Sequence, residues 1–536
     1  MDKVFYNGKI YSMDSSDNVY SAIGISGDRI SFLGNADDGS LPEAGQYIDL
    51  KGMTVLPGFT DSHLHMLNYG FLEKSYKMYD ADSVSGIIEE GRRRIRDMKD
   101  RPPEKWLYGR GWNNDKFTDY RRFLTRNDLD MISQDRPVLF IRVCGHVAAV
   151  NSKALEMVMN LPETGSYIHQ IDEKNGILTE AAVKLCYNAM QEPEVDDIKE
   201  MILAVQPLYN QAGITAVESD NFLSLPGRNR HRIMQAYREL SEEGRLTVRV
   251  REQASFTDFE GMKDFIDSGI RTGDGDSYYS IGPVKLYQDG SLGARTALMK
   301  EPYKGSSQNC GTMVHDREEL QRMVNYAYEH DMQIIVHAIG DRASLMVFDA
   351  YEKAIEIYGD RHLRLAINHL QITDPALPGR MAAKNILAYI QPVFVASDKN
   401  MVEGCVGTKR AERSYMWRTF EDVGVVCCGG SDSPVENFNI LENIQIAVTR
   451  DSIGEKTDGW MPWQKLTVRQ AVKLFTGNCA YGAFAENERG TLEKGKLADM
   501  TVLSRDIFET DCHEIADIAV EAAVTGGKIV YKREER

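Results

Sequence analysis

Two histidines separated by one residue, His63 and His65, have the spacing of a metal-binding pair. They end the stretch LPGFTDSHLH that starts at Leu56, just after a short apolar run. On an extended strand alternate side chains share one face, so both imidazoles should point the same way. Neutral imidazoles are common ligands of transition metals. Histidines that only pack at a strand end would give the same pattern, so the pair needs support from the rest of the chain.

Other residues with suitable chemistry stand at comparable points of apolar segments. His337 and His369 each close such a segment, and Asp432 follows another. Lys285 lies inside Pro283–Tyr287, which otherwise has the pattern of a buried strand. Taken singly, each histidine is better explained as a hydrogen-bonded structural residue. Several of them converging on one place are better explained by a metal site.

Eight strand-like segments carry these residues, and helical patterns such as Glu318–Tyr328 separate most of them. The candidate strands are the stretch before His65, Ile214–Glu218, Leu246–Arg251, Val284–Tyr287, Ile334–His337, Leu365–His369, Ile386–Ile390 and Val425–Gly429. This alternation predicts an α/β fold, a (β/α)8 TIM barrel. Active sites of such barrels form at the carboxyl ends of the strands, which is where the histidines and Asp432 fall.

Both ends of the chain have the pattern of short strands and turns. Asn7-Gly8 lies between two strand-like triplets, and Gly526-Gly527 interrupts a similar pair near the carboxyl end. We therefore expect one small β-sandwich domain from residues 1–55 and 486–536, with the barrel over residues 56–485. A helix is predicted over Val84–Met98, and an insertion at about 100–200.

Composition narrows the class of protein. The 536 residues carry a net charge of −17, which argues against nucleic acid or an anionic membrane as partner and leaves a small-molecule substrate. The start of the chain lacks an apolar signal segment, and no run is long and apolar enough to span a membrane. The eight cysteines form no CxxC pair, which indicates a reduced, cytoplasmic protein. Homo-oligomerisation stays open.

Ten short pieces, in order, resemble one known family. They are NGKI from Asn7, PGFTDSHLH from Pro57, GRGWNND from Gly109, GHVAAVNSKAL from Gly145, VKLYQDGSLGARTA from Val284, VHAIGDRA from Val336, NHLQ from Asn368, IQPV from Ile390, GGSDSPVE from Gly429 and GTLEKGKLADMTVL from Gly490. Each piece is weak alone, but their order over nearly the whole chain is specific. The sequence resembles the amidohydrolase superfamily, in its amidohydrolase family 3 branch of N-substituted formamide deformylase-like proteins.

The resemblance implies a set of metal ligands and a catalytic residue. The implied ligands are His63, His65, Lys285, His337, His369 and Asp432, with Asp432 also the catalytic carboxylate. An ammonium has no lone pair, so Lys285 would take part as a carbamate formed with CO2, bridging two metals. Burial lowers the pKa of a lysine and so supplies the neutral amine that carboxylation needs. The alternative is an unmodified lysine paired with Asp289 or Asp432.

The implied chemistry is hydrolysis of a C–N bond, most simply an amide, N-acyl or N-formyl bond. One or two divalent ions per chain, zinc or another metal, would activate water. Asp432 would take the proton from that water and pass it to the departing nitrogen. Two alternatives stay open: a mononuclear deaminase of an amine-bearing heterocycle, and a non-catalytic barrel scaffold. Deaminases of this superfamily tend to carry HxxE at the strand-5 histidine and lack the lysine, whereas Gly340 stands at the glutamate position here.

Residues outside the ligand set are candidates for binding substrate. Trp112, Asn113 and His146 lie in the predicted insertion, which should overhang the barrel mouth, and Gln391 ends the seventh barrel strand. Trp112 could equally be a core aromatic of the insertion, and Gln391 could satisfy only the barrel rim. Two positions depart from the family pattern. Asn368 stands where a glutamate is common, and Phe394 where a histidine is frequent.

Overall fold

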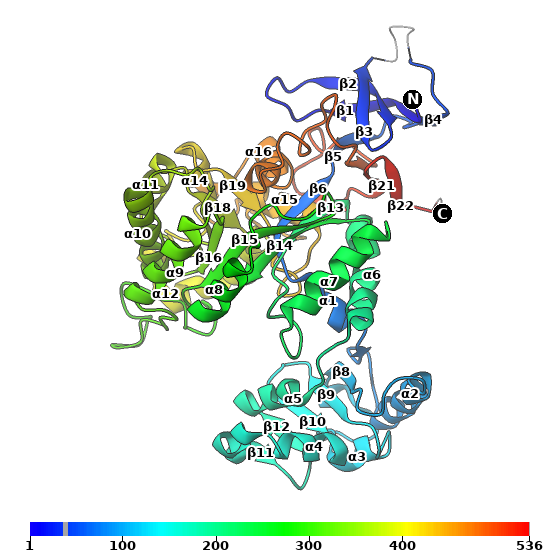
Figure 1. The fold of residues 1–536 in the computed structure, drawn as a ribbon, viewed down its shortest axis with the longest axis vertical. Coiled ribbons are helices and arrows are strands. Elements are labelled where there is room, and N and C mark those ends of the chain that lie inside the picture. The colour runs from blue at the N-terminus through cyan, green and yellow to red at the C-terminus, as the bar shows by residue number, and fades with distance from the viewer. Residues whose placement is uncertain (36–40, 535–536) are drawn as a thin grey trace. The chain divides into compact units, whose positions relative to one another are not determined.

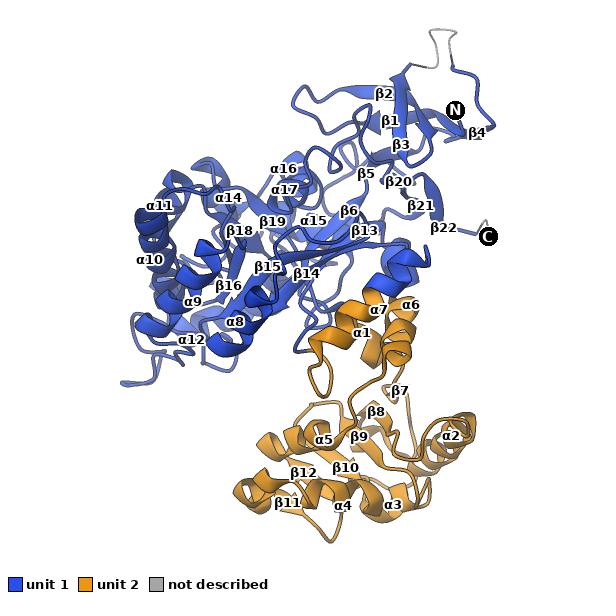
Figure 2. Cartoon of the chain, in the orientation of Figure 1, with its two compact units in different colours: residues 1–66, 206–223, 238–536 blue, residues 67–205, 224–237 orange. Residues whose placement is uncertain are grey.

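The computed structural model describes residues 1–35 and 41–534, which form two compact units. The first unit comprises residues 1–66, 206–223 and 238–536, and the second comprises residues 67–205 and 224–237 (Figure 2). Each has its own sheets and core. Among the described residues, no helix is long and apolar enough to cross a membrane.

Eight parallel strands form the barrel of the first unit (Figure 1). In chain order they are β6 (Phe59–Leu64), β13 (Ile214–Ser219), β14 (Arg249–Ser255), β15 (Tyr279–Tyr287), β16 (Ile334–Ala338), β17 (Ala366–His369), β18 (Leu387–Ile390) and β19 (Cys427–Gly429). Each strand pairs with the next in parallel register. All eight predicted strands are present, and the (β/α)8 fold is confirmed.

Irregular contacts join the first and last barrel strands. The Asp432 amide donates to the His63 carbonyl at 2.7 Å, and the His65 amide donates to the Ser433 carbonyl at 2.7 Å. The buried Asp61 carboxylate accepts the amides of His63 (3.1 Å) and Ser431 (3.0 Å). A Cβ at Gly430 would lie 2.8 Å from the His63 amide, so only glycine allows this approach. These contacts between the first strand and the segment after the last strand therefore fix His63 and His65 beside Asp432.

Amphipathic helices follow most of the barrel strands. They are α6 (Val195–Gln211), α7 (Arg230–Glu242), α8 (Phe259–Asp267), α9 (Arg317–Glu329), α10 (Asp341–Tyr358), α11 (Leu377–Ala383), α12 (Phe394–Val406), α13 (Thr408–Ala411), α14 (Trp417–Asp422), α15 (Ile440–Thr449), α16 (Val468–Leu474) and α17 (Gly477–Gly482). In α9, Leu320, Met323, Val324 and Ala327 are buried at helical spacing. The Asp316 side chain caps this helix by accepting two backbone amides.

Both chain ends build an eight-stranded sheet in the first unit. Its order is β22-β21-β20-β5-β1-β2-β3, with β4 also paired to β1. The strands are β1 (Lys3–Tyr11), β2 (Val19–Ser26), β3 (Arg29–Gly34), β4 (Gln46–Asp49), β5 (Thr54–Pro57), β20 (Met500–Leu503), β21 (Val520–Thr525) and β22 (Lys528–Lys532). Strand β20 lies antiparallel against β5, which leads directly into β6. A buried ion pair between Arg249 and Asp499, at 2.7 Å, ties β14 to the start of β20.

The second unit contains a six-stranded sheet of order β11-β12-β10-β9-β8-β7. Its strands are β7 (Tyr76–Lys77), β8 (Leu107–Trp112), β9 (Val138–Arg142), β10 (Val147–Val150), β11 (Ile171–Asp172) and β12 (Ile177–Thr179), accompanied by helices α1 (Met66–Glu73), α2 (Val84–Asp97), α3 (Arg126–Asp130), α4 (Ser152–Met159) and α5 (Val183–Ala189). Helix α2 matches the helix predicted over Val84–Met98. The unit begins at Leu67, earlier than the insertion expected at about 100–200, because β7 and α2 pack with this sheet and its core.

One barrel strand lies further along the chain than the sequence suggested. Strand β14 runs from Arg249 to Ser255, whereas the apolar pattern placed it at Leu246–Arg251. The polar residues Glu252, Gln253 and Ser255 continue the strand because their side chains are buried and hydrogen-bonded or enclosed in the barrel. A strand that carries polar residues inside the barrel lacks the apolar pattern by which strands are predicted from the sequence.

Candidate metal centre

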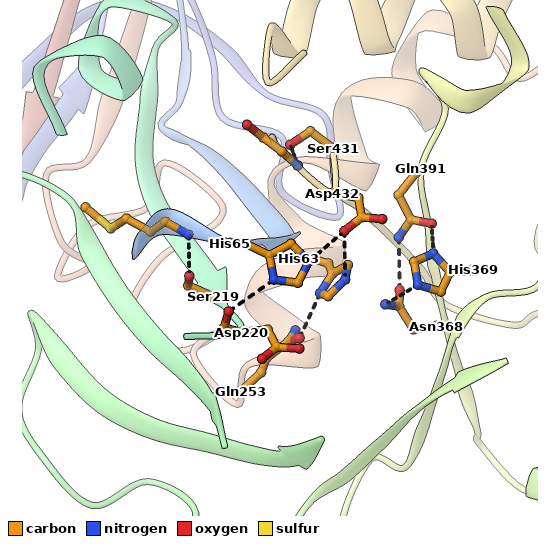
Figure 3. A network of polar contacts seen from close by, with 12 residues as sticks. His63, His65, Ser219, Asp220, Gln253, Asn368, His369, Gln391, Ser431 and Asp432 are labelled. Carbon is orange, nitrogen blue, oxygen red and sulfur yellow. Dashed lines mark hydrogen bonds and ion pairs between the residues drawn. The ribbon is translucent and has the colours of Figure 1, made fainter. Parts of the chain in front are cut away.

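The predicted ligands lie on or directly after the barrel strands, all within the first unit. Figure 3 shows four of them, His63, His65, His369 and Asp432. Asp432 Oδ1 lies 2.9 Å from Nε2 of His65 and 3.3 Å from Nε2 of His63. The His369 ring centre lies 5.5 Å from that of His63 and 4.4 Å from that of His337. The four imidazoles and the carboxylate thus form one continuous cluster.

Two of these imidazoles are held by oxygen atoms behind them. Nδ1 of His63 lies 2.8 Å from Oε1 of Gln253, and the Gln253 amide nitrogen donates to the Ser62 carbonyl at 2.9 Å, which fixes the orientation of the amide. Nδ1 of His65 lies 3.1 Å from the carbonyl oxygen of Asp220. A carbonyl oxygen only accepts hydrogen bonds, so both Nδ1 atoms carry the proton. Nε2 of each ring is then the atom with a free lone pair.

The other two imidazoles follow the same rule. Nδ1 of His369 lies 2.8 Å from Oε1 of Gln391, whose nitrogen donates to the Asn368 side-chain oxygen at 2.9 Å. Nε2 of His337 lies 3.1 Å from the carbonyl oxygen of Gly290. The lone pairs therefore sit on Nε2 of His369 and Nδ1 of His337. Such anchoring of the outer nitrogen is the usual support for a metal-binding histidine, so this donor set fits a divalent metal.

The electrostatics keep most of these groups in the state that a ligand needs. Burial and the neighbouring charge of Lys285 lower the pKa of His63 to about 4, and burial holds the pKa of His369 well below its usual value. Burial alone would raise the pKa of Asp432, but the hydrogen bonds and charges of His63 and His65 outweigh it and hold this pKa well below its ordinary range. The carboxylate is therefore ionised. Burial alone would lower the pKa of His65, but the hydrogen bond to Asp432 and the Asp432 charge outweigh it and raise this pKa, so His65 differs from the neutral His63 and His369.

Lys285 lies on β15 and its side chain is completely buried. Its Nζ has no hydrogen-bond partner among the described residues, so it pairs with neither Asp289 nor Asp432 by a short contact. Burial lowers the pKa of Lys285 to about 8, although the charges of Asp220 and Asp432 act in the opposite direction. Asp289 instead accepts the backbone amides of Leu298, Ile339 and Gly340.

Comparison with known proteins decides the family. The model of the amidohydrolase family matches residues 46–531, which is nearly the whole chain. The chain belongs to the amidohydrolase family. It is 33% identical to amidohydrolase YtcJ of Bacillus subtilis (strain 168), over 99% of this chain and 100% of that protein. It is 24% identical to the N-substituted formamide deformylase of Arthrobacter pascens, over 99% of this chain and 98% of that enzyme.

A solved structure gives the same result. An uncharacterised metal-dependent hydrolase from Pyrococcus furiosus is 28% identical and superposes with a TM-score of 0.79, covering 95% of this chain and 100% of the other. Membership of the amidohydrolase family and this neighbour support hydrolase activity and a divalent metal for the present chain.

Four residues were predicted to bind substrate in this amidohydrolase. Gln391 lies within the cluster, where it anchors His369. Trp112 is fully buried in the second unit, and its indole N–H donates to the Phe140 carbonyl at 3.1 Å. Asn113 caps a short helical turn at Asn114–Lys116. His146 is exposed and lies 3.0 Å from the Glu180 carboxylate. Their part in substrate binding remains a prediction.

Of the four anchoring partners, only Gln391 was among the residues predicted from the sequence. Gln253 lies in the polar half of β14, where no apolar pattern marked a strand. The other two anchors are the carbonyl oxygens of Asp220 and Gly290, and a backbone atom has no signature in the sequence. Asn368, noted as a departure from the family pattern, donates to Nε2 of His369 at 3.1 Å and orients Gln391. The Asn368 side chain thus accepts the hydrogen bond of the Gln391 amide, which in turn anchors His369.

Proposed function

We propose that this chain is a metal-dependent hydrolase that cleaves the C–N bond of a small amide, with an N-acyl or N-formyl amine as substrate class. One observation carries the proposal. Four buried or half-buried imidazoles are anchored through their outer nitrogens by oxygen atoms, and Nε2 of His63 and of His65 face the ionised Asp432 carboxylate. The name of the Arthrobacter relative, an N-substituted formamide deformylase, supports the choice of bond.

The ligand set proposed is that of the sequence analysis. The ion or ions would be held by His63, His65, His337, His369, Asp432 and a carboxylated Lys285. A bound divalent metal, zinc for example, supplies acidity to a water molecule and polarises the substrate carbonyl. The buried Lys285 supports the carbamate, because its pKa of about 8 increases the fraction of neutral amine, the form that reacts with CO2, and its Nζ has no hydrogen-bond partner among the described residues.

Asp432 would carry the proton. Its carboxylate is ionised and faces Nε2 of both His63 and His65. The backbone N–H of Asp432 donates a hydrogen bond to the His63 carbonyl, which holds the residue in place. A carboxylate so placed can accept a proton from the attacking water and deliver it to the departing nitrogen. The two steps return Asp432 to its starting state, so one residue serves as base and then acid.

The deaminase alternative has less support. The position of the deaminase glutamate is Gly340, whose amide donates to Asp289 at 2.8 Å. A Cβ at this position would lie 2.0 Å from the Leu298 carbonyl oxygen, so this backbone has no room for a glutamate side chain. The presence of the buried Lys285 also argues against the deaminase alternative, because deaminases of this superfamily tend to lack this lysine.

A substrate survey tests the proposal. Protein prepared with zinc and bicarbonate is offered N-formyl and N-acyl amines and, separately, amine-bearing heterocycles, and the release of free amine or ammonia is measured. We expect amine release from the acylated amines, lost on chelation and restored by metal. Ammonia from a heterocycle alone would favour the deaminase, and neither product with fully metallated protein would overturn the hydrolase proposal.

Lys285→Ala tests the carbamate. The variant should lose metal and activity together, and a short carboxylic acid should restore part of both by replacing the carbamate oxygens. A variant with unchanged metal content and turnover would show that Lys285 has only a structural part.

A further inference from the structure

A second group of metal-ligating side chains lies in the loop between β20 and the short helix η6 (Ile515–Asp517). Sγ of Cys512 is 3.4 Å from Nδ1 of His513, and this nitrogen is 3.5 Å from Oδ1 of Asp511. The three donor atoms all lie within 4.8 Å of one another. Asp511 is exposed and the other two are half-buried, so a dissolved ion can reach them.

The donor separations match the edges of a zinc tetrahedron. With a metal–sulfur distance of about 2.3 Å and a metal–nitrogen or metal–oxygen distance of about 2.0 to 2.2 Å, neighbouring donors stand roughly 3.3 to 3.6 Å apart. The separations of 3.4 and 3.5 Å that involve Nδ1 of His513 both fall in that interval. A thiol–imidazole hydrogen bond accounts for the first separation, and the Asp511 oxygen that faces the ring also accepts the His513 backbone amide at 2.9 Å. The loop therefore holds the three donor atoms close together.

His513 is oriented from a different part of the chain. Asp451 follows α15, its side chain is almost completely buried, and its Oδ2 lies 3.3 Å from Nε2 of His513. Thr457 fixes the Asp451 carboxylate by donating its amide at 2.9 Å and its hydroxyl at 2.5 Å. A carboxylate accepts, so Nε2 carries the proton and the lone pair lies on Nδ1, toward Cys512 and Asp511. A buried carboxylate behind a histidine is the support that metal-binding histidines use.

Charged groups of both signs lie near the loop. The carboxylates of Asp511 and Asp451, on either side of the His513 ring, favour a cation. Lys456 near Asp511 and Lys465 near Cys512 oppose a cation, but neither supplies a ligand atom.

We propose that Asp511, Cys512 and His513 bind one zinc-like divalent cation. The ligand atoms are the Asp511 carboxylate oxygen, the Cys512 thiolate and Nδ1 of His513, with water in the fourth position. Binding releases the thiol proton to solvent. The ion would fasten the loop after β20 to the segment after α15, because His513 reaches Asp451. The site shares no residue with the barrel cluster and does not depend on the proposed hydrolysis.

Cobalt(II) distinguishes this site from the barrel. The proposed barrel ligands offer only nitrogen and oxygen, so a thiolate-to-cobalt charge-transfer band reports a cysteine ligand. With the full chain titrated with Co²⁺, we expect the band in the unsubstituted protein and its loss in Cys512→Ser. Zinc analysis should show about one ion per chain fewer in that variant, consistent with loss of a single structural site. His513→Asn should lose the band as well.

Cys310→Ser is the matched control, because Cys310 is also a partly exposed free cysteine. It should keep the band and the full zinc content. The proposal is overturned if saturating Co²⁺ gives no band in the unsubstituted chain, if the band survives in Cys512→Ser, or if it disappears in Cys310→Ser. Circular dichroism of each variant confirms folding, and the cysteine-to-serine change is small enough to keep the loop.

Discussion

At the scale of single residues, the partners of the four histidines set the charge of the centre. Three of the four rings are anchored by a neutral oxygen: His63 by the Gln253 side chain, His65 by the Asp220 backbone carbonyl and His369 by the Gln391 side chain. Neutral acceptors orient the rings and fix their tautomers without adding negative charge. At His337 the Gly290 carbonyl oxygen lies 3.1 Å and the Asp289 carboxylate 3.4 Å from the same Nε2, so this ring alone has a negative charge behind it. Among the proposed ligands, the charge that compensates a divalent ion comes from Asp432 and, once carboxylated, from Lys285.

Among the proposed ligands, Asp432 is therefore the residue whose substitution should lower turnover most. Asp432→Asn keeps the size and shape of the side chain but removes the proton acceptor. We expect kcat to fall roughly 10² to 10⁴-fold, the range for general acid–base catalysis, with most of the metal retained by the four histidines. The measurement is kcat together with bound metal on any substrate found in the survey.

Asp258→Asn serves as the control for this change. Asp258 caps α8 by accepting the Gly261 amide, and asparagine caps a helix about as well as aspartate. This variant should keep its kcat. If Asp432→Asn retains activity within a few-fold of the unsubstituted chain at equal metal content, Asp432 has no part in proton transfer.

At the scale of elements, the sequence predicts what depends on apolar periodicity. Seven of the barrel strands were placed within a few residues, because their apolar runs and the helices between them have distinct periods. The residues that close these runs, such as His337 and His369, were found for the same reason. Strand β14 was misplaced because its second half is polar, and Gln253 was missed with it. The backbone anchors could not be found at all, since a carbonyl position depends on the fold.

The second unit gives Trp112 a structural explanation that can be measured. Its side chain is fully buried among apolar residues that include Phe117 and Phe140. Trp112→Ala should destabilise this unit by about 3 to 5 kcal/mol, the usual cost of emptying a buried aromatic site. Chemical denaturation followed by circular dichroism gives the change in unfolding free energy. A substrate-binding part would instead raise KM in a protein of unchanged stability.

Trp463→Ala is the matched control for Trp112→Ala. Trp463 is 60% exposed, so its removal should change the unfolding free energy by less than about 0.5 kcal/mol. Equal effects of the two substitutions would contradict the structural explanation, because burial is the property in which they differ.

At the scale of the whole molecule, the two ends of the chain complete one sheet that supports the candidate site. Strand β5 is buried throughout and lies between β1 and β20, so it has a partner from each terminus. The Gly58 amide donates to the Asp499 carbonyl at 2.9 Å at the point where β5 passes into β6. The HxH segment therefore leaves a strand that the carboxyl-terminal residues hold in place.

A truncation after Leu497 tests this dependence. It removes β20, β21 and β22, exposes an edge of β5, and takes three large buried side chains, Met500, Val502 and Val524, from the core of the sheet. At about 1.5 to 3 kcal/mol per buried side chain, the loss is roughly 5 to 9 kcal/mol. That equals much of the 5 to 15 kcal/mol by which folded proteins are commonly stable. We therefore expect aggregated protein that binds no metal at the barrel cluster, measured by size-exclusion chromatography and metal analysis. A truncation after Lys532 removes only residues beyond β22 and should leave folding and metal content unchanged. If the longer truncation yields soluble protein that keeps the metal of the barrel cluster, the terminal strands are dispensable for the site, and β5 and β6 hold the histidines without them.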